Sequence, residues 1–366
     1  MLGGVCTTRS QIGMMDIIKP STLAAKASQV AVLSAVRNEI QLIGAFFRHY
    51  RSIGVDEFHI VDNGSTDGTL EFCLSQPDCH VYSTADSYLS ARYGLDWIEE
   101  LAIRHCSERW ALYADCDEHF IYPGFGQISV HEFAQVLHQS GHNCCYAIML
   151  DMYADKDIAD EGALQGDDPT ESFRYFDSDY RVRWHPRPPW SDPQDAPLQV
   201  LGGPRVRLLS DMESEWRRDG MDYFWLGKID RLIAVTPTPL LRRLFATWPN
   251  LIPALHKTPL NFISGGFRYY SAHNCSNSNS SPSMACHLHY KFVNELVSVR
   301  ATSSLQLNHY RRGLEREQLR RAILRAGSTL IYPGSQEYTG RGSLERAGLL
   351  GDHFAHVLGS RGKAGQ

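Results

Sequence analysis

Apolar segments of strand length recur through the first 120 residues, separated by polar turns and by stretches with helical spacing. Residues 29–36, 57–61 and 110–114 are mostly apolar runs of five to eight residues. Such runs are typical of strands buried on both faces of a parallel sheet. Residues 78–83 are a fourth candidate strand. The pattern predicts an α/β protein with a parallel sheet near its N-terminus.

Two helices are predicted between these strands. The first is marked by apolar residues at i, i+3, i+4 and i+7, followed by a glycine that ends the pattern: Ile43, Phe46, Phe47, Tyr50 and Gly54. The second covers residues 94–105, ahead of the strand at 110–114, where Leu95, Ile98, Leu101 and Ala102 share one face. Strands that alternate with helices form parallel sheets with right-handed connections. The carboxyl ends of the strands are therefore expected at one edge.

Polar clusters follow three of the predicted strands. They are Asn38-Glu39, the acidic and glycine-rich stretch 62–69, and the stretch 115–118, which contains Asp115 and Asp117. Ligands of open α/β sheets bind at the carboxyl ends of the strands. Two carboxylates separated by one residue can converge on Mg²⁺ or Mn²⁺, which would also use oxygens of a diphosphate. An isolated pair of this kind is more often a solvated turn or a helix cap, but three clusters at one edge favour a cation site.

The middle of the chain is less regular. Residues 131–139 predict a helix, and residues 143–152 predict a buried strand that ends at Asp151. Residues 154–197 are rich in Asp, Pro, Arg and aromatic side chains and show little periodicity. Long irregular segments in compact proteins often form substrate loops.

The last third of the chain contains one strand that carries candidate ligands. In the predicted strand 286–292, His287 and His289 alternate with Leu288 and therefore project from the same face. Residues 311–325 predict a surface helix with a basic face. That face could be solvated, or it could lie against anionic lipid.

Composition and charge exclude some classes of protein. The chain has 366 residues, of which 43% are hydrophobic and 21% are charged, as is ordinary for a globular enzyme. A net charge of −5 argues against a general nucleic-acid-binding protein. An anionic substrate would have to be bound by local cations or by a metal.

The cysteines and the apolar runs bear on where the protein works. The nine cysteines are odd in number and form no C-x-x-C pair, which favours reduced, buried thiols. No run of 18 apolar residues and no secretory signal is found. We therefore expect a cytoplasmic protein.

The polar clusters resemble the successive signatures of the family 2-like glycosyltransferases with a GT-A fold. The matching stretches are 36–39, 61–69 and Asp115-Cys116-Asp117-Glu118. Further pieces resemble a bacterial branch of that superfamily: 150–153, 175–177, 202–205, 256–260, 271–273 and 287–292. The resemblance implies a mostly parallel central sheet flanked by helices over residues 29–300. It leaves 1–28 as an N-terminal tail and 301–366 as a C-terminal helical extension and tail.

The resemblance also implies a site for a nucleoside-diphosphate sugar. The residues expected to bind the nucleotide are Asn38, Glu39, Asp62, Asp67 and Asp115. The expected ligands of Mn²⁺ or Mg²⁺ are Asp115, Asp117 and His289, with His287 as the alternative to His289. Without this resemblance, two histidines on a strand are more often core or surface residues.

The catalytic base is less well marked. Many members of the superfamily carry an acidic Glu-Asp pair in the second half, and this chain has no Glu-Asp dipeptide. Asp151 is the candidate to deprotonate the acceptor hydroxyl, although a residue in this place is more often an ordinary strand-end cap. Arg205 and Lys257 could contact the diphosphate, or they could be ordinary solvated cations.

The expected function is sugar transfer. A metal-dependent glycosyltransferase would move a sugar from a nucleoside diphosphate, expected to be UDP, onto a glycan or lipid-linked acceptor, with inversion. Such a step would belong to polysaccharide biosynthesis at the inner face of the plasma membrane. One alternative is a nucleotidyltransferase that makes the activated sugar, but Arg37-Asn38-Glu39 stands where that class has a glycine-rich loop. The other is a non-catalytic sugar-nucleotide-binding module on the same fold.

Overall fold

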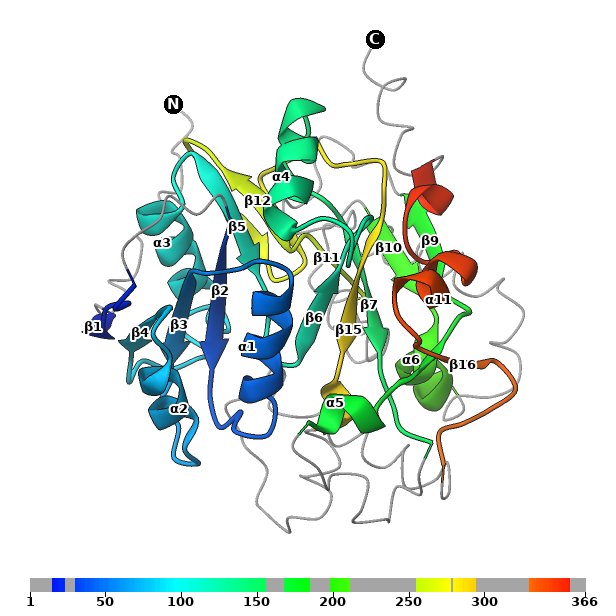
Figure 1. The fold of residues 1–366 in the computed structure, drawn as a ribbon, viewed down its shortest axis with the longest axis horizontal. Coiled ribbons are helices and arrows are strands. Elements are labelled where there is room, and N and C mark those ends of the chain that lie inside the picture. Colours follow the sequence, from blue (N-terminus) through cyan, green and yellow to red (C-terminus); the bar gives the residue numbers. More distant parts are fainter. Residues whose placement is uncertain are drawn as a thin grey trace, which may run out of the picture.

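The main sheet has six strands. It lies in one half of the molecule (Figure 1). The computed structural model describes residues 15–23, 30–155, 168–184, 198–210, 255–277, 279–293 and 329–355. In spatial order the strands are β1 (Asp16–Lys19), β4 (Cys79–Ser83), β3 (Phe58–Asp62), β2 (Val30–Val36), β5 (Arg109–Tyr113) and β12 (Leu260–Ile263). The four central strands are parallel, and β1 and β12 pair antiparallel at the edges. This confirms the predicted α/β class with a mostly parallel central sheet.

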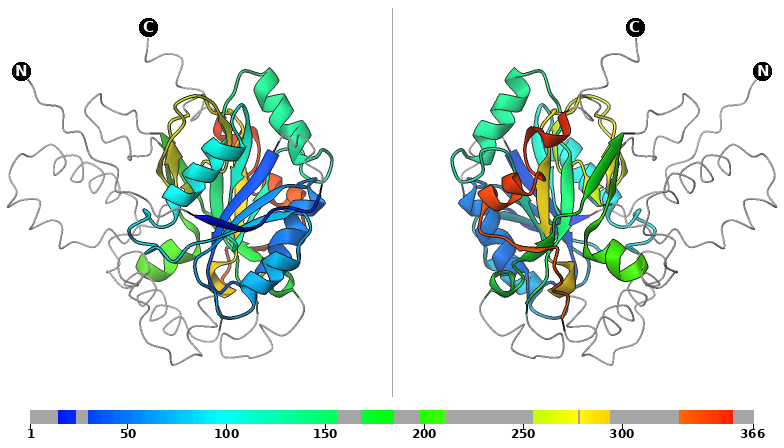
Figure 2. Two further views of the ribbon diagram at one scale, coloured as in Figure 1. Left: turned by 90° about the vertical axis from the view of Figure 1, so that its left-hand side faces the viewer. Right: turned by 90° about the vertical axis from the view of Figure 1, so that its right-hand side faces the viewer.

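Helices cover both faces of this sheet (Figure 2). They are α1 (Ile43–Ser52), α2 (Thr69–Ser75) and α3 (Leu95–His105). The apolar stripe of α1 packs into the larger of two core clusters, whereas α3 packs into the other cluster on the opposite face. Gly54 takes a left-handed φ of 98° just after α1, so the glycine does end the helix as predicted. Both predicted helices are confirmed.

A second, smaller sheet stands beside the first (Figure 1). Its strands, in spatial order, are β11 (His256–Lys257), β7 (Ala147–Asp151), β15 (Ala285–His289) and β6 (Glu118–Ile121). Strand β15 runs parallel to β7 and antiparallel to β6. The strands predicted over 143–152 and 286–292 are thus present but shorter, and they belong to this second sheet.

Helix α4 (Val130–Gln139) follows β6 and confirms the helix predicted over 131–139. It begins with a capping box, in which the Ser129 side chain accepts from the amide of Glu132 and the Glu132 carboxylate accepts from the amide of Ser129. The smaller elements are α5 (Pro169–Ser172), β8 (Tyr175–Asp177), β9 (Arg181–Trp184), β10 (Leu198–Leu201), α6 (Gly203–Ser210), β13 (Tyr269–Ser271) and β14 (Asn274–Cys275).

Both ends of the chain contribute more structure than expected. Strand β1 lies in the segment expected to be an N-terminal tail, because its backbone pairs with the free edge of β4. At the other end, β16 (Ser335–Glu337) pairs with β8 and is followed by α11 (Arg341–Arg346) and a short 3₁₀ helix, η4 (Asp352–Phe354). Leu344, Leu349 and Leu350 are buried in the main core, so this stretch is not a tail. The basic helix predicted over 311–325 lies outside the described residues.

Eight cysteines fall in the described part of the chain, and all eight are buried free thiols. Within that same part, the structure shows no helix whose length and hydropathy would let it cross a membrane.

Acid is expected to destabilise this fold through buried histidines. His256 in β11 is 5% exposed, and burial lowers its pKa to about 3, below the value of about 6.5 in the unfolded chain. The stability contributed by the neutral ring is complete above about pH 6.5 and is lost as the pH falls towards 3. We expect this histidine to cost about 1.4 kcal/mol of unfolding free energy per pH unit within that window. Urea unfolding of metal-free protein at about pH 7 and about pH 4.5 should give a shallower pH dependence for His256→Leu than for the wild type. Equal slopes would contradict the prediction.

Candidate functional site

Three polar clusters meet at one edge of the main sheet. Strand β2 lies between β3 and β5, and all three run parallel. Their carboxyl ends therefore bring Asn38, Asp62 and Asp115 to the same edge, as the sequence predicted.

The turns after β2 and β3 are bonded to each other. Asn38 adopts a left-handed φ of 58°, and its side-chain oxygen accepts from the amide of Thr66 at 2.8 Å. The Asp67 carboxylate accepts from the amide and hydroxyl of Thr69 and from the amide of Ile40. Burial opposes ionisation of Asp67, but these hydrogen bonds hold its pKa below the usual range. The Asp67 carboxylate thus holds the loop together.

The two carboxylate oxygens of Asp62 differ in their hydrogen bonding. Its side chain is 1% exposed, and Oδ2 accepts from the amides of Gly64 and Ser65 at 3.0 and 3.1 Å. Within the described ranges, Oδ1 is buried without a hydrogen-bond partner. A buried, unsatisfied carboxylate oxygen is costly unless a ligand meets it, so its chemistry fits a nucleotide donor group. The neighbouring Glu39 donates its backbone amide to the Thr69 hydroxyl at 2.8 Å.

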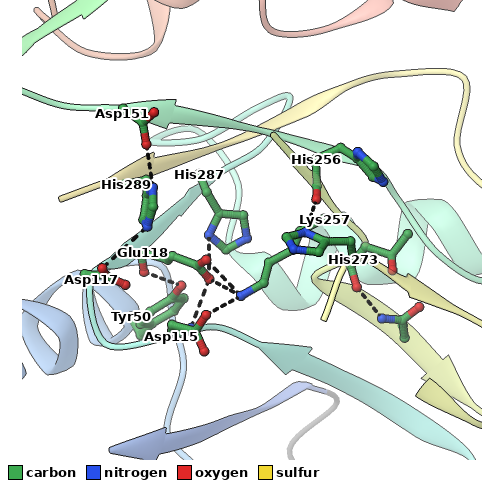
Figure 3. A network of polar contacts seen from close by, with 12 residues as sticks. Tyr50, Asp115, Asp117, Glu118, Asp151, His256, Lys257, His273, His287 and His289 are labelled. Atoms are coloured by element: carbon green, nitrogen blue, oxygen red, sulfur yellow. Dashed lines mark hydrogen bonds and ion pairs between the residues drawn. The ribbon is translucent and has the colours of Figure 1, made fainter. Parts of the chain in front are cut away.

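A tight turn joins β5 to β6 and positions the acidic motif (Figure 3). The amide of Glu118 donates to the carbonyl of Asp115 at 3.0 Å, and the amide of Asp115 donates to Glu118 Oε2 at 2.9 Å. The side chain of Asp115 is 43% exposed, whereas that of Glu118 is fully buried. The turn therefore points one carboxylate outward and the other inward.

Lys257 on β11 lies between these two carboxylates (Figure 3). Its Nζ is 2.7 Å from Asp115 Oδ2 and 2.8 and 2.7 Å from the two oxygens of Glu118. Burial raises the pKa of Glu118 to about 7, and the ammonium of Lys257 works against that rise. Burial also disfavours the charged lysine, but Asp115 and Glu118 outweigh it and raise the Lys257 pKa. The three groups form an ion-pair cluster.

His289 on β15 joins two other carboxylates (Figure 3). Its Nδ1 lies 2.6 Å from Asp151 Oδ1, and its Nε2 lies 3.4 Å from Asp117 Oδ2. Arg205 Nε donates to the other Asp151 oxygen at 2.7 Å. Burial disfavours the charged ring, but Asp117 and Asp151 raise the His289 pKa to about 9. Burial likewise opposes ionisation of Asp117, but His289 outweighs it and lowers the Asp117 pKa.

Three side chains around His289 could together hold a metal ion. Asp117, Glu118 and His289 each offer one ligand atom, and these atoms lie within 4.8 Å of one another. The structure thus brings the predicted ligands Asp117 and His289 together. The group also includes Glu118, a residue that the sequence did not single out. Asp115, which was predicted as a ligand, forms an ion pair with Lys257 instead. The chemistry of carboxylate and imidazole donors suits several divalent cations.

Asp151 and Arg205 lie behind His289. Both are buried, with side chains 0% and 5% exposed, and they form an ion pair. Burial opposes ionisation of Asp151, but Arg205 and His289 lower its pKa. The proposed role of Asp151 as the acceptor's base stays a prediction, which this enclosure disfavours. A diphosphate contact by Arg205 also stays a prediction.

Two further histidines adjoin the cluster. His287 is fully buried, with Nδ1 3.7 Å from Glu118 Oε2, and within the described residues its ring nitrogens have no hydrogen-bond partner. His273, which the sequence analysis did not single out as a site residue, donates from Nδ1 to the carbonyl of His256 at 2.7 Å. Burial and the neighbouring Lys257 lower the His273 pKa to about 4, so its ring stays neutral near pH 7.

Comparisons with known proteins give a partial match. No family model matches the chain. A glycosyltransferase family 92 protein of Oryza sativa subsp. japonica is 30% identical over 109 residues, which cover 27% of this chain and 17% of that protein. The chain therefore spans about a sixth of the length of this relative.

Two solved structures share only remote likeness. A putative glucose-1-phosphate thymidylyltransferase from Bacillus anthracis matches with 7% identity and a TM-score of 0.22, over 35% of this chain and 56% of that one. A 4-diphosphocytidyl-2C-methyl-D-erythritol synthase matches with 17% identity and a TM-score of 0.21, over 38% and 67%. Scores this low add nothing to the topology described above. Over the matched stretch the chain resembles a glycosyltransferase. That relative belongs to family 92, whereas the motifs led us to expect family 2.

Proposed function

We propose that the protein is a metal-dependent glycosyltransferase. It transfers a sugar from a nucleoside diphosphate, expected to be UDP, to a glycan or lipid-linked acceptor with inversion. The observation that carries the proposal is the convergence at one sheet edge of Asp62, Asp115 and the Asp117–His289 pair. The partial match to a glycosyltransferase supports it.

The nucleotide would bind across the ends of β2, β3 and β5. The free oxygen of Asp62 would accept a hydrogen bond from the base, beside the loop that contains Asn38 and Glu39. The exposed carboxylate of Asp115 would accept from the ribose hydroxyls. The Asp115 carboxylate is already exposed, whereas Asp62 Oδ1 is buried, so binding of the base would require the side chains that cover this atom to move.

The residues present fit a divalent cation. Nδ1 of His289 faces the Asp151 carboxylate, which fixes the ring so that Nε2 points at Asp117. Carboxylate–histidine–metal chains of this kind orient the ligand histidine. With all four carboxylates ionised and His289 deprotonated to act as a ligand, Asp115, Asp117, Glu118 and Asp151 outnumber their cationic partners Lys257 and Arg205 by two charges, which one divalent ion would balance. Bound there, the ion would neutralise the departing nucleoside diphosphate.

Replacing Asp151 by asparagine separates the two roles considered for it. If Asp151 orients His289, we expect Asp151→Asn to weaken Mn²⁺ binding by about 10- to 100-fold. If Asp151 instead deprotonates the acceptor, the turnover rate should fall by about 10²- to 10⁴-fold with unchanged Mn²⁺ affinity. Titration calorimetry with Mn²⁺, combined with turnover at saturating metal, distinguishes these outcomes. We expect the first.

The function itself is tested by ligand-induced stabilisation. UDP at about a hundred times its dissociation constant should stabilise the native state by about 2.7 kcal/mol, and we expect this effect to require Mn²⁺. A screen of nucleotide sugars for metal-dependent hydrolysis then identifies the donor. Pyrophosphate release from a nucleoside triphosphate and a sugar phosphate would indicate a nucleotidyltransferase instead. Binding of UDP with no turnover of any nucleotide sugar would indicate a non-catalytic module.

A further inference from the structure

The hydrogen-bonding capacity of Lys257 is fully used inside the protein. Its side chain is 1% exposed, and its Nζ lies over the ring of Tyr113 at 4.4 Å. An ammonium group has three N–H donors. Three carboxylate oxygens, one of Asp115 and two of Glu118, lie within 2.8 Å of Nζ. No donor of Lys257 is left for a diphosphate, which is the contact expected from the sequence.

The two carboxylates held by Lys257 differ in what they can do. Glu118 is fully buried and also accepts from the amide of Asp115. Asp115 is 43% exposed and meets Lys257 through Oδ2. The Tyr113 side chain also contributes a hydrogen bond with the Asp115 carboxylate, which nevertheless stays exposed at the sheet edge. Lys257 thus fixes one oxygen of a carboxylate that a ligand at the sheet edge can still reach.

We propose that Lys257 is a positioning residue of the donor site, whose buried ammonium holds Asp115 in place to accept from the hydroxyls of the donor's ribose. Lys257 binds no phosphate. The cation is left to the group of Asp117, Glu118 and His289, and ribose recognition by Asp115 does not depend on it. This inference rests on the proposed function.

A fixed ammonium suits this task better than a second metal ion would. The lysine is tethered to β11, whose pairing with β7 sets its place. Its positive charge offsets the repulsion between two carboxylates that face each other across the Asp115–Glu118 turn. Because the lysine is part of the chain, Asp115 is oriented before any ligand binds, which lowers the entropy cost of binding.

The test uses two probes, uridine with a chelator present and UDP with Mn²⁺. Lys257→Met should weaken both by a similar factor, at least about tenfold, because the ribose is common to both. Lys257→Met could also unfold the chain by leaving Glu118 buried and unpaired. The double variant Lys257→Met/Glu118→Gln removes that charge, and it should fold while showing the same loss of uridine affinity. Lys19→Met, on β1 far along the sheet from β5, is the matched control and should bind both probes as the wild type does.

Three results would overturn the inference. Loss of UDP affinity with unchanged uridine affinity in Lys257→Met would mean that Lys257 contacts the diphosphate directly. Unchanged uridine affinity in the double variant would mean that Asp115 needs no anchor. If the wild type binds neither probe, the proposed function fails, and the inference fails with it. If the wild type binds both probes and the Lys257 variants bind them equally well, this inference is refuted while the proposed function still stands.

Discussion

Replacing Asp117 by asparagine is expected to lower the rate of sugar transfer by about 10³-fold or more. The substitution keeps the shape of the side chain but removes the negative charge that faces His289 Nε2 at 3.4 Å. A cation held by His289 without this carboxylate would bind weakly. A bound metal is worth several kcal/mol of transition-state charge stabilisation, and about 4 kcal/mol corresponds to a factor of about 10³.

Turnover of the nucleotide sugar found by the screen, measured over a range of Mn²⁺ concentrations, tests this prediction. Asp56→Asn is the matched control, because Asp56 is an exposed acid at the other end of β3. It should leave the rate unchanged. Full activity of Asp117→Asn at low Mn²⁺ would place the cation elsewhere and would remove the main support for a metal-dependent mechanism.

Replacing Arg205 by methionine is expected to destabilise the protein by about 3–5 kcal/mol. Arg205 and Asp151 are both buried and bonded at 2.7 Å, so among the described residues the substitution leaves this enclosed carboxylate with His289 as its counter-ion. Removing one partner of a buried ion pair typically has a cost of this size. The double variant Arg205→Met/Asp151→Asn removes the stranded charge and should recover a large part of the loss.

Urea unfolding provides the measurement. Arg48→Met is the matched control, because Arg48 forms an ion pair with Asp168 in which its own side chain is 55% exposed. Exposed pairs contribute about 1 kcal/mol or less, so the control should differ little from the wild type. Equal losses for the two single variants would show that burial does not set the strength of the Arg205 pair.

The first half of the fold could be predicted because its signals are local. The apolar runs of β2, β3 and β5 involve residues close together in the chain, and so does the helical spacing of α1. A parallel α/β order then brings the strand ends to one edge, which placed Asp62 and Asp115 together.

The rest of the site depends on contacts that no local pattern encodes. Lys257 meets Glu118 across 139 positions of sequence, and the strand order of the second sheet is set by pairings of comparable length. Glu118 was overlooked because an acid at the start of a strand looks solvated until a buried lysine is known to pair with it. Strand β1 was missed because Ile17 and Ile18 are adjacent and both exposed, without the alternation that marks a half-buried strand.

The packing of the C-terminal segment sets a limit on how the chain can be shortened. Gly351 forms an isolated β-bridge with Met284, the residue directly before β15, which contains His289. Leu344 and Leu350 are buried in the same core cluster as Leu288 of β15. A truncated version for crystallisation or domain fusion should therefore keep residues through 354. Removal of more residues would disturb the packing of β15, and the resulting loss of activity could be attributed wrongly to the proposed site.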